Sequence, residues 1–527
     1  MSNHWRFLWL FPVLLTACIQ PTPLKPVVNS AFVASGSTTV TVRGRDLQAI
    51  AAMLAGQTAT ITQRSATFDA IQLQVPQPLQ SGNFTLQMQF DGAATVTQDV
   101  FVLPSSADVL AADLATERNK YLLRGAGFLA IPPSVSQTTL DSALSGAGFS
   151  SVGLVEPEPG ADGVCANRFV SVQDTQIARD TLEGLNALNN QLRQSLPDNV
   201  DFELNAKLMS NQPDGTGSPT QSARVTPQAL PGGLSSVRIA VLDSGISLNP
   251  AFGNAIDFVA ARNFTAEDDP SNLEPLLTDV SDLAKDASTS AVVGHGTAVA
   301  GVVLQTLRTA IGFDNVLTNG AASIVPVKVC EGGNGRCSSS SAVAGVCYAT
   351  SLAGTARPVK VINLSLGGEL PSNLLRRALE HAASKGISIV TSAGNKGTVA
   401  SRPVNFPAQY SVASGTPAIA GLLAVGSVNA AVSPSAFSSQ GDWVSLTALG
   451  EDISAPSTTG GQAIFNGTSF SAPRVAAAAL LLHAQAAPAA ITPAAVKTKL
   501  ITSVKVIPCS SQLCGAGLLD VTKSLLP

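Results

Sequence analysis

The chain has 527 residues, of which 45% are hydrophobic and 13% are charged. This composition can support a sizeable buried core, and the length indicates about two to four domains. With 31 Lys and Arg residues against 35 Asp and Glu residues, the formal net charge is −4. Because no block of basic residues occurs, the sequence offers no surface for nucleic acid, and this class of partner is excluded.

Residues 1–17 have the pattern of an export signal, in which Arg6 precedes an apolar run from Phe7 to Leu15 and small residues follow. The run is shorter than the roughly 18 residues of a membrane-spanning helix, although a permanent anchor helix is the alternative. The segment "LTAC" resembles a bacterial lipobox, which implies that the signal is removed at Cys18 and that this cysteine carries a lipid. The expected location is therefore the cell envelope, as a membrane-anchored lipoprotein. A secretory signal without a lipid is the competing interpretation.

The chain contains seven cysteines. If Cys18 is lipidated, an even six remain, as expected for disulfides in an oxidising compartment. Cys509 lies close enough in the sequence to pair with Cys514, and Cys330 close enough to pair with Cys337, but the sequence leaves the connectivity open. A zinc site is the alternative, although the chain has no CxxC motif and only four histidines.

Four segments of different composition lead to the C-terminal half of the chain. Residues 18–29 are rich in proline and indicate a tether. Residues 30–104 alternate apolar and polar positions in short runs such as "TTVTVRG" and "FTLQMQF", which predicts a small antiparallel β-sandwich. The rhythm of these strands resembles immunoglobulin-like domains of the IPT/TIG type. Residues 106–210 mix strand-like runs with a helical run at 180–196, which predicts an α+β unit. Residues 211–234, dense in Pro, Gly, Ser and Thr, predict a flexible linker and a domain boundary.

Residues 235–527 alternate buried strands with helices. The near-continuous apolar runs are "VRIAVLDSG", "SIVPVKV", "VKVINLSLG", "GISIVTSAGN" and "LLAVGSV". Such runs are typical of parallel strands that are buried on both faces, so we expect a doubly wound, mainly parallel α/β sheet. Ligands bind at the carboxyl ends of such strands, where this sequence has "DSG", "SLGG" and "AGN".

Three residues in this region could carry acyl transfer by serine, which needs a hydroxyl, a base and a carboxylate that orients the base. His295 is the one histidine in a glycine-flanked setting, "GHGTAVAG", and its ordinary pKa of ~6.5 suits a base. Asp243 follows an apolar run, although an Asx turn is the alternative. Ser469 precedes an alanine-rich helix, for which Ser471 is the better predicted cap and Pro473 fits the first turn.

The three local patterns together resemble a known family. "VLDSGI", "GHGTAVAG" and "NGTSFSAP" resemble the three signature segments of the subtilisin-like serine proteases, and they occur in the same chain order. The resemblance extends from about Ser235 to Leu526. It implies that Asp243 orients the base, that His295 is the general base and then the acid, and that Ser469 is the nucleophile.

The same resemblance implies further site residues. Asn395 in "TSAGN" would stabilise the oxyanion, with a turn asparagine as the alternative. The substrate backbone would pair with Ser365, Leu366 and Gly367 and face Ser392, Ala393 and Gly394, unless the first segment is a plain buried strand. Pairing through the main chain implies broad specificity for polypeptides. No cofactor is required. Structural calcium is common in the family, but the sequence has no ligand cluster dense enough to place a calcium or other metal site.

The leading hypothesis is an exported, lipid-anchored serine endopeptidase with polypeptide substrates. In the family, an N-terminal propeptide often blocks the cleft until it is removed, and residues 106 to about 230 occupy that position, although a permanent accessory domain is the alternative. A binding module with an inactive protease-like domain is a second class. An ester hydrolase is a third, but its G-x-S-x-G elbow is incomplete around Ser469. A segment with three cysteines at 328–347 lies near the expected substrate strand and could reshape the cleft.

Overall fold

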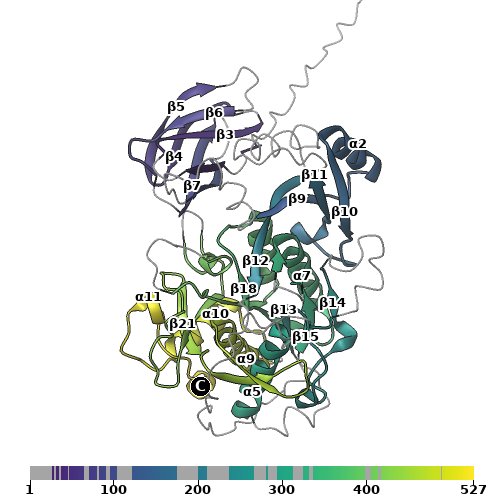
Figure 1. Ribbon diagram of the computed structural model, residues 1–527, viewed down its shortest axis with the longest axis vertical. Coiled ribbons are helices and arrows are strands. Elements are labelled where there is room, and N and C mark those ends of the chain that lie inside the picture. The colour runs from purple at the N-terminus through teal and green to yellow at the C-terminus, as the bar shows by residue number, and fades with distance from the viewer. Residues whose placement is uncertain are drawn as a thin grey trace, which may run out of the picture.

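Figure 1 shows the computed structural model of the chain. The structure describes residues 27–28, 31–34, 37–45, 47–64, 70–79, 82–90, 95–103, 122–174, 200–210, 237–265, 280–282, 294–311, 324–331, 336–397, 405–413, 417–487 and 489–526. The predicted export signal, Cys18, the helical run 180–196 and the linker 211–234 lie outside these residues, as does nearly all of the tether.

The N-terminal strands form one sheet around a single core. They are β1 (Val27–Val28), β2 (Ala31–Ala34), β3 (Thr39–Arg45), β4 (Ala49–Leu54), β5 (Gln57–Arg64), β6 (Ala70–Gln74), β7 (Gly82–Phe90) and β8 (Val96–Leu103). Their order is β1-β3-β6-β5-β4-β7-β8-β2, in which β2 pairs with β8 in parallel and the other neighbours are antiparallel. Val40, Leu73, Leu54 and Leu86 come from four of these strands and share one buried cluster. The alternation seen in the sequence thus gives the sheet a buried face.

A second unit follows, with a helix over an antiparallel sheet. It consists of β9 (Leu122–Ile131), α2 (Gln137–Ala147), β10 (Phe149–Val155), η1 (Gly163–Ala166), β11 (Arg168–Asp174) and β12 (Asp201–Ser210), and its strand order is β10-β11-β9-β12. Ser136 caps α2 at its start, and Gly148 ends it in the left-handed conformation. Leu140 and Leu144 of the helix are buried in the cluster that the sheet contributes to.

The C-terminal region is built on a parallel sheet. Its strands are β13 (Arg238–Asp243), β14 (Arg262–Asn263), β15 (Ile324–Lys328), β17 (Val359–Leu364), β19 (Ser388–Ser392), β20 (Leu422–Val428) and β21 (Val444–Leu449), in the order β14-β15-β13-β17-β19-β20-β21. The longer helices are α5 (His295–Ile311), α7 (Ser339–Ser351), α8 (Asn373–Ser384), α9 (Thr468–Ala486) and α10 (Pro493–Thr502). Short elements are β16 (Arg336–Ser338), β18 (Leu366–Gly367), β22 (Ile453–Pro456), β23 (Gln462–Phe465), η3 (Pro250–Phe252), η4 (Phe258–Ala260), η5 (Leu352–Gly354), η6 (Ala408–Ser411), α11 (Ser511–Cys514) and α12 (Val521–Leu525). This is the predicted α/β sheet.

Helices cover both faces of the parallel sheet. Ile239 and Val241 of β13 pack in the same buried cluster as α5 and α9. Ala240 and Leu242, which alternate with them, pack in a second cluster with α7 and α8. Because successive side chains of a strand point to opposite faces, a strand between two helical layers must be apolar at every position. This explains the continuous apolar runs of the sequence.

The strand β12 joins the second unit to the C-terminal region. At its start it pairs with β9, and at its end it pairs with both β16 and β18, antiparallel in each case. Met209 is opposite Gly367, and Ser210 is opposite Leu366. In Figure 1, β12 runs from the second unit at the upper right down to β18. The two regions therefore share a continuous sheet as well as a buried cluster.

The disulfides are Cys165–Cys347, Cys330–Cys337 and Cys509–Cys514. The last two are the pairs that lie close in the sequence, and the first joins the second unit to α7. Within the described ranges, no helix combines the length and the apolar character needed to cross a membrane.

Candidate active site

A buried carboxylate and a buried imidazole meet at the carboxyl end of the parallel sheet. Asp243 is the last residue of β13, and His295 is the first residue of α5. Asp243 Oδ1 lies 2.7 Å from His295 Nδ1, and neither residue is more than 1% exposed. Because a carboxylate only accepts, His295 donates from Nδ1, and Nε2 is the acceptor of the neutral ring. Nε2 has no hydrogen-bond partner among the residues that the structure describes.

Glycines allow α5 to begin this close to β13. A Cβ atom on Gly296 would lie 2.2 Å from the carbonyl oxygen of Gly245 and 3.0 Å from the Cβ atom of Asp243. Gly294 has a φ of +79°, in the left-handed region that favours glycine. The glycines on either side of His295 are therefore needed for the helix to approach the strand.

Ser469 lies in the first turn of α9, and its side chain is fully buried. The helix begins at Thr468, after Gly467, whose φ of +149° again favours glycine. The expectation that Ser471 caps this helix, with Pro473 in the first turn, is wrong. Ser471 donates to a backbone carbonyl of β21 at 3.0 Å, and Pro473 lies inside the helix.

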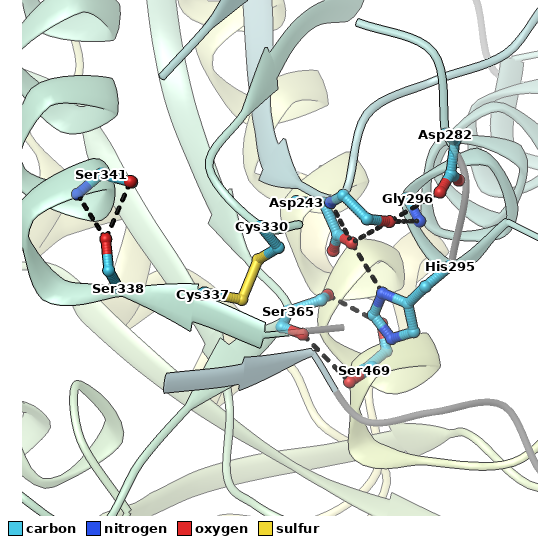
Figure 2. Close-up of a disulfide and its surroundings, with 11 residues drawn as sticks. Asp243, Asp282, His295, Gly296, Cys330, Cys337, Ser338, Ser341, Ser365 and Ser469 are labelled. Atoms are coloured by element: carbon cyan, nitrogen blue, oxygen red, sulfur yellow. Dashed lines mark hydrogen bonds and ion pairs between the residues drawn. A yellow bond between two sulfur atoms is a disulfide. The ribbon is translucent and has the colours of Figure 1, made fainter. Parts of the chain in front are cut away.

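The position of Pro473 has a consequence for Ser469. Proline has no N–H, so Pro473 cannot donate to the carbonyl of Ser469, four residues earlier. The Ser365 hydroxyl donates to this carbonyl at 2.8 Å, and the Ser469 hydroxyl donates to the carbonyl of Ser365 at 3.2 Å (Figure 2). The amide of Asn363 donates to the Ser365 hydroxyl at 3.0 Å. These bonds fix the start of α9 against the end of β17.

His295 lies beside the residue that follows Ser469. The rings of His295 and Phe470 have centroids 5.4 Å apart. Figure 2 shows Asp243, His295 and Ser469 in succession from the end of the strand to the start of the helix. The structure thus brings the three predicted residues together. The Ser469 hydroxyl donates to the carbonyl of Ser365 rather than to His295. A hydrogen bond between a nucleophile and its base often forms only when substrate is bound.

Asn395 faces the start of α9 from the turn after β19. Its Oδ1 atom accepts from the backbone N–H of Thr468 at 2.9 Å and from the Thr468 hydroxyl at 2.7 Å. Because both groups of Thr468 are donors, the side-chain oxygen of Asn395 faces them and its Nδ2 group points away from them. A Cβ atom on Gly467 would lie 2.9 Å from this Nδ2. Asn395 therefore presents N–H donors beside the turn that carries Ser469.

The two predicted walls of a cleft follow neighbouring strands. Ser365, Leu366 and Gly367 follow β17, and Ser392, Ala393 and Gly394 begin at the end of β19, with which β17 pairs. Asn405 lies between the walls: its Nδ2 donates to the carbonyl of Ser392 at 3.2 Å, and a Cβ atom on Gly367 would lie 2.4 Å from the same Nδ2. The sequence does not reveal Asn405, because its segment "VNFPA" has no strand or helix pattern that places it near these two segments.

A second buried carboxylate lies behind Asp243 and His295. Asp282 accepts from the backbone N–H and the hydroxyl of Thr297, both at 2.7 Å, and from the Ser244 hydroxyl at 2.8 Å. Asp282 thus links the residue after Asp243 to the first turn of α5. The sequence does not single out Asp282 either, because its local pattern does not distinguish it from the other acidic residues in the segment before His295.

These charges act on the ionisation of the imidazole. Burial lowers the pKa of His295, but the charge and hydrogen bond of Asp243 and the charge of Asp282 outweigh burial, so that the pKa is raised above its ordinary value. The pKa of Asp282 is also raised, chiefly by burial and further by the charge of Asp243, against the hydrogen bonds that it accepts. Asp282 therefore contributes to the basicity of His295.

The disulfide Cys330–Cys337 lies close to Asp243 (Figure 2). The carbonyl of Asp243 accepts from the N–H groups of Val329 at 2.8 Å and Cys330 at 3.2 Å. Cys337 belongs to β16, which pairs with β12, so the disulfide ties β16 to the end of β13. The remaining cysteine of the segment, Cys347, is directed away to Cys165. In the described part of the chain, no group of three or more His, Cys, Asp or Glu side chains is arranged to hold a metal ion.

We predict that Asp282→Asn lowers the pKa of His295. The substitution removes a negative charge that favours the imidazolium, while an amide keeps most of the shape and can still accept a hydrogen bond. Proton NMR of the His295 ring across the range in which imidazole titrates measures the change. The exposed Asp442→Asn serves as the control and should leave the titration where it is in the wild type. An unchanged or raised pKa in Asp282→Asn would contradict the assigned role.

One family model and several known proteins match this chain. The model of the Subtilase family matches residues 235–517. An "Extracellular protease" of Xanthomonas campestris pv. campestris is 29% identical over 303 residues, which cover 54% of this chain and 50% of that protein. Subtilisin E of Bacillus subtilis is 33% identical over 251 residues, which cover 47% of this chain and 55% of that protein.

The matched segment spans about half the length of each of these relatives. Among solved structures, a cold adapted subtilisin-like serine proteinase is 25% identical, with 56% of this chain and 93% of that chain covered and a TM-score of 0.42. The family match includes Asp243, His295, Asn395 and Ser469, the residues that the fold gathers at the carboxyl end of its parallel sheet. With more than half of its length matched in this way, the chain belongs to the subtilase family.

Proposed function

We propose that this protein is an exported serine endopeptidase that hydrolyses peptide bonds through an acyl-enzyme. The observation that carries the proposal is the buried hydrogen bond between Asp243 and His295, beside the helix turn that holds Ser469. The names of the two relatives, an extracellular protease and a subtilisin, support the same chemistry. The proposal requires no cofactor.

The proposed reaction begins when His295 Nε2 takes the proton of the Ser469 hydroxyl. The oxygen attacks the carbonyl carbon of the substrate, and Asp243 stabilises the imidazolium that results. Asn395 Nδ2 and the backbone N–H of Ser469 would donate to the oxyanion, because Asn395 faces the start of α9, where that N–H lies. The imidazolium then gives its proton to the leaving amine, and water, activated by the same base, releases the acyl group.

The raised pKa of His295 sets the acid limit of this reaction. Below that pKa the ring is protonated and cannot accept the proton of Ser469, so activity is lost as the pH falls through it. Above that pKa the neutral ring predominates and the base is available. Because Asp282 helps to raise the pKa, its charge moves the acid limit towards higher pH.

The proposed substrate is an extended polypeptide that lies between β16 and β18. Support comes from β12, which pairs with both edges through its main chain. Hydrogen bonds between main chains depend little on the side chains of the substrate, so we propose a broad specificity for polypeptides. Ser365 to Gly367 on one side and Ser392 to Gly394 on the other would bind the residue before the cut.

We further propose that residues 106–210 act as an intramolecular inhibitor. The occupation of the cleft edges by β12 supports this role, and so does the contact with α8. Glu203 of β12 accepts from the Ser372 hydroxyl at 2.6 Å and from the N–H groups of Asn373 and Leu374 at the start of α8. A carboxylate at a helix N-terminus satisfies N–H groups that have no partner in the helix.

The proposal also covers the export and anchoring of the chain. Residues 1–17 would be the signal and Cys18 the lipidated residue, so that the protein is held at a membrane of the cell envelope. The three disulfides support an oxidising compartment. Residues 30–104 would be an immunoglobulin-like domain between the anchor and the inhibitor, and residues 211–234 a linker to the peptidase domain at 235–527.

We predict that the wild type hydrolyses casein and that Ser469→Ala loses at least about 10³-fold of this activity, because removing a nucleophile removes the acyl-enzyme route. The assay measures release of soluble peptides by the full chain, with and without a thiol reductant. The exposed Ser384→Ala is the matched control and should behave as the wild type. Equal hydrolysis by wild type and Ser469→Ala would refute the proposed nucleophile.

We predict that Asn395→Ala lowers kcat for a peptide substrate by about 10² to 10³, a magnitude taken from the loss of one such donor in subtilisin. KM should change much less, because the donor acts on the transition state. Steady-state kinetics of Asn395→Ala and of the exposed neighbour variant Lys396→Ala measure both constants. A kcat within twofold of the wild type would show that Asn395 has no such role.

We predict that the wild type, but not Ser469→Ala, is cut just after β12. Ser210 is opposite Leu366, next to Ser365, whose carbonyl accepts from the Ser469 hydroxyl. A new N-terminus should therefore appear at or shortly after residue 211. N-terminal sequencing of the reduced protein identifies it. An uncut chain with full activity would contradict the inhibitor role.

A further inference from the structure

A disulfide crosses between the proposed inhibitor and the peptidase domain. Cys165 belongs to η1 of the second unit, Cys347 belongs to α7, and they are 182 residues apart in the sequence. The segment 211–234, where the chain is proposed to be cut, lies between them. A cut there interrupts the backbone but leaves the two parts joined through sulfur.

The disulfide is enclosed by the contact between the two parts. Cys165 is 2% exposed and Cys347 is 8% exposed. Both belong to a buried cluster to which the second unit also contributes Phe128, Phe169 and Leu208. Burial of both cysteines slows the attack of a thiolate on the disulfide, so the bond should persist after the backbone is cut unless a reductant is supplied.

Ion pairs hold the same part of the second unit against α8. Asp162, next to η1, lies 2.6 Å from Lys385 Nζ and 3.0 Å from His381 Nε2. Arg377 of α8 pairs with Asp201 at the start of β12. These pairs are partly exposed and contribute little individually. They do orient the unit on the helix next to α7, with which α8 packs.

The sheet that contains β12 begins close to Cys165 in the sequence. β11 begins two residues after η1, β11 pairs with β9, and β9 pairs with β12. Cys165 and Phe128, which lies on β9, share one buried cluster. The disulfide at Cys165 therefore also restrains β12, because β11, β9 and β12 are neighbouring strands of one sheet.

We propose that the Cys165–Cys347 disulfide keeps residues 122–210 bound to the peptidase domain after the chain is cut, so that the cut protein stays latent until this disulfide is reduced. The inference rests on the proposed self-cleavage and inhibition. A tether of this kind keeps a displaced inhibitor at an effective concentration of about millimolar, so β12 returns to the cleft faster than a substrate at lower concentration occupies it.

Release requires a two-electron step by a dithiol reductant. One thiolate of the reductant attacks a sulfur of the disulfide and forms a mixed disulfide, which expels the other cysteine as a thiolate. The second thiolate of the reductant then displaces the bound cysteine and closes its own disulfide. In total, Cys165 and Cys347 gain two electrons and two protons, and the dithiol loses them. The second unit, with the N-terminal sheet attached to it, can then leave.

The link itself is tested without any activity of the protein. In the full-length Ser469→Ala variant, a recognition site for an added sequence-specific protease is placed within residues 211–234, and the purified protein is cut there. We expect one species with the combined mass of both fragments under denaturing, non-reducing conditions, and two species after reduction. Two separate fragments without reductant would overturn the proposal.

The latency is tested with the cut wild type and the Cys165→Ser/Cys347→Ser double variant. Without reductant, we expect the double variant to cleave casein at least about tenfold faster than the wild type, because its inhibitor can leave by dilution. A dithiol should raise the activity of the wild type towards that of the double variant. The Cys509→Ser/Cys514→Ser variant is the control, because its disulfide lies outside this contact, and it should remain as latent as the wild type.

The outcomes separate this inference from the proposed function. Full activity of the cut, disulfide-linked wild type without reductant would overturn the latency while leaving the peptidase intact. Absence of casein hydrolysis in every folded variant, with or without reductant, would overturn the proposed function and the latency with it. The mass measurement on the Ser469→Ala variant decides the covalent link in either case.

Discussion

The hydrogen bond between Asp243 and His295 joins two parts of the chain at the point where a strand ends and a helix begins. Both side chains are buried, and a buried carboxylate is costly unless hydrogen-bond donors surround it. The imidazole and the N–H of Ser244 supply those donors to Asp243 Oδ1. The contact is possible only because glycines lie on both sides of His295, so the local sequence and the buried pair depend on each other.

Hydrogen bonds also join the other elements of the site to one another. Pro473 has no N–H to donate to the carbonyl of Ser469, and the Ser365 hydroxyl donates to it instead, which ties α9 to the segment that follows β17. Asn395 ties the wall after β19 to the first residue of the same helix. The ends of β17 and β19 thus meet the start of α9, and the end of β13 meets the start of α5, so the groups proposed for catalysis lie on backbone that is held from several sides.

The pairing of β12 with β16 and β18 bears on the access of substrate to the proposed active site. A strand that pairs with both β16 and β18 uses the main-chain groups that an extended substrate would use. In a covalently linked inhibitor, the strength of that pairing no longer decides whether the cleft opens, because dissociation is followed by rapid return. Under the proposal, the redox state of the Cys165–Cys347 disulfide then controls access to the cleft.

Much of the fold was predictable because buried parallel strands leave a continuous apolar pattern, and each appears where its run lies, β13 and β20 among them. Asp243, His295 and Ser469 could be picked out as candidates because each lies at the end or the start of an element with its own local sequence pattern. Asp282 and Asn405 were missed, since their positions depend on contacts between distant segments. The predicted start of the helix at Ser471 was wrong. A proline is tolerated inside α9 because the Ser365 hydroxyl, far away in the sequence, donates to the carbonyl that Pro473 cannot serve. The pairing of Cys165 with Cys347 likewise depends on the contact of the second unit with α7, because the two cysteines are 182 residues apart in the sequence.

The central claim is that Ser469 is an activated nucleophile. The most direct measurement is the intact mass of the soluble protein, begun after Cys18, before and after treatment with a fluorophosphonate, followed by peptide mapping, with Ser469→Ala beside it. The protein is cut and reduced beforehand so that the cleft is accessible. The account predicts one adduct on the wild type, located at Ser469, and none on the variant. A folded, cut and reduced wild type that takes up no adduct, or takes it up at another serine, would contradict it.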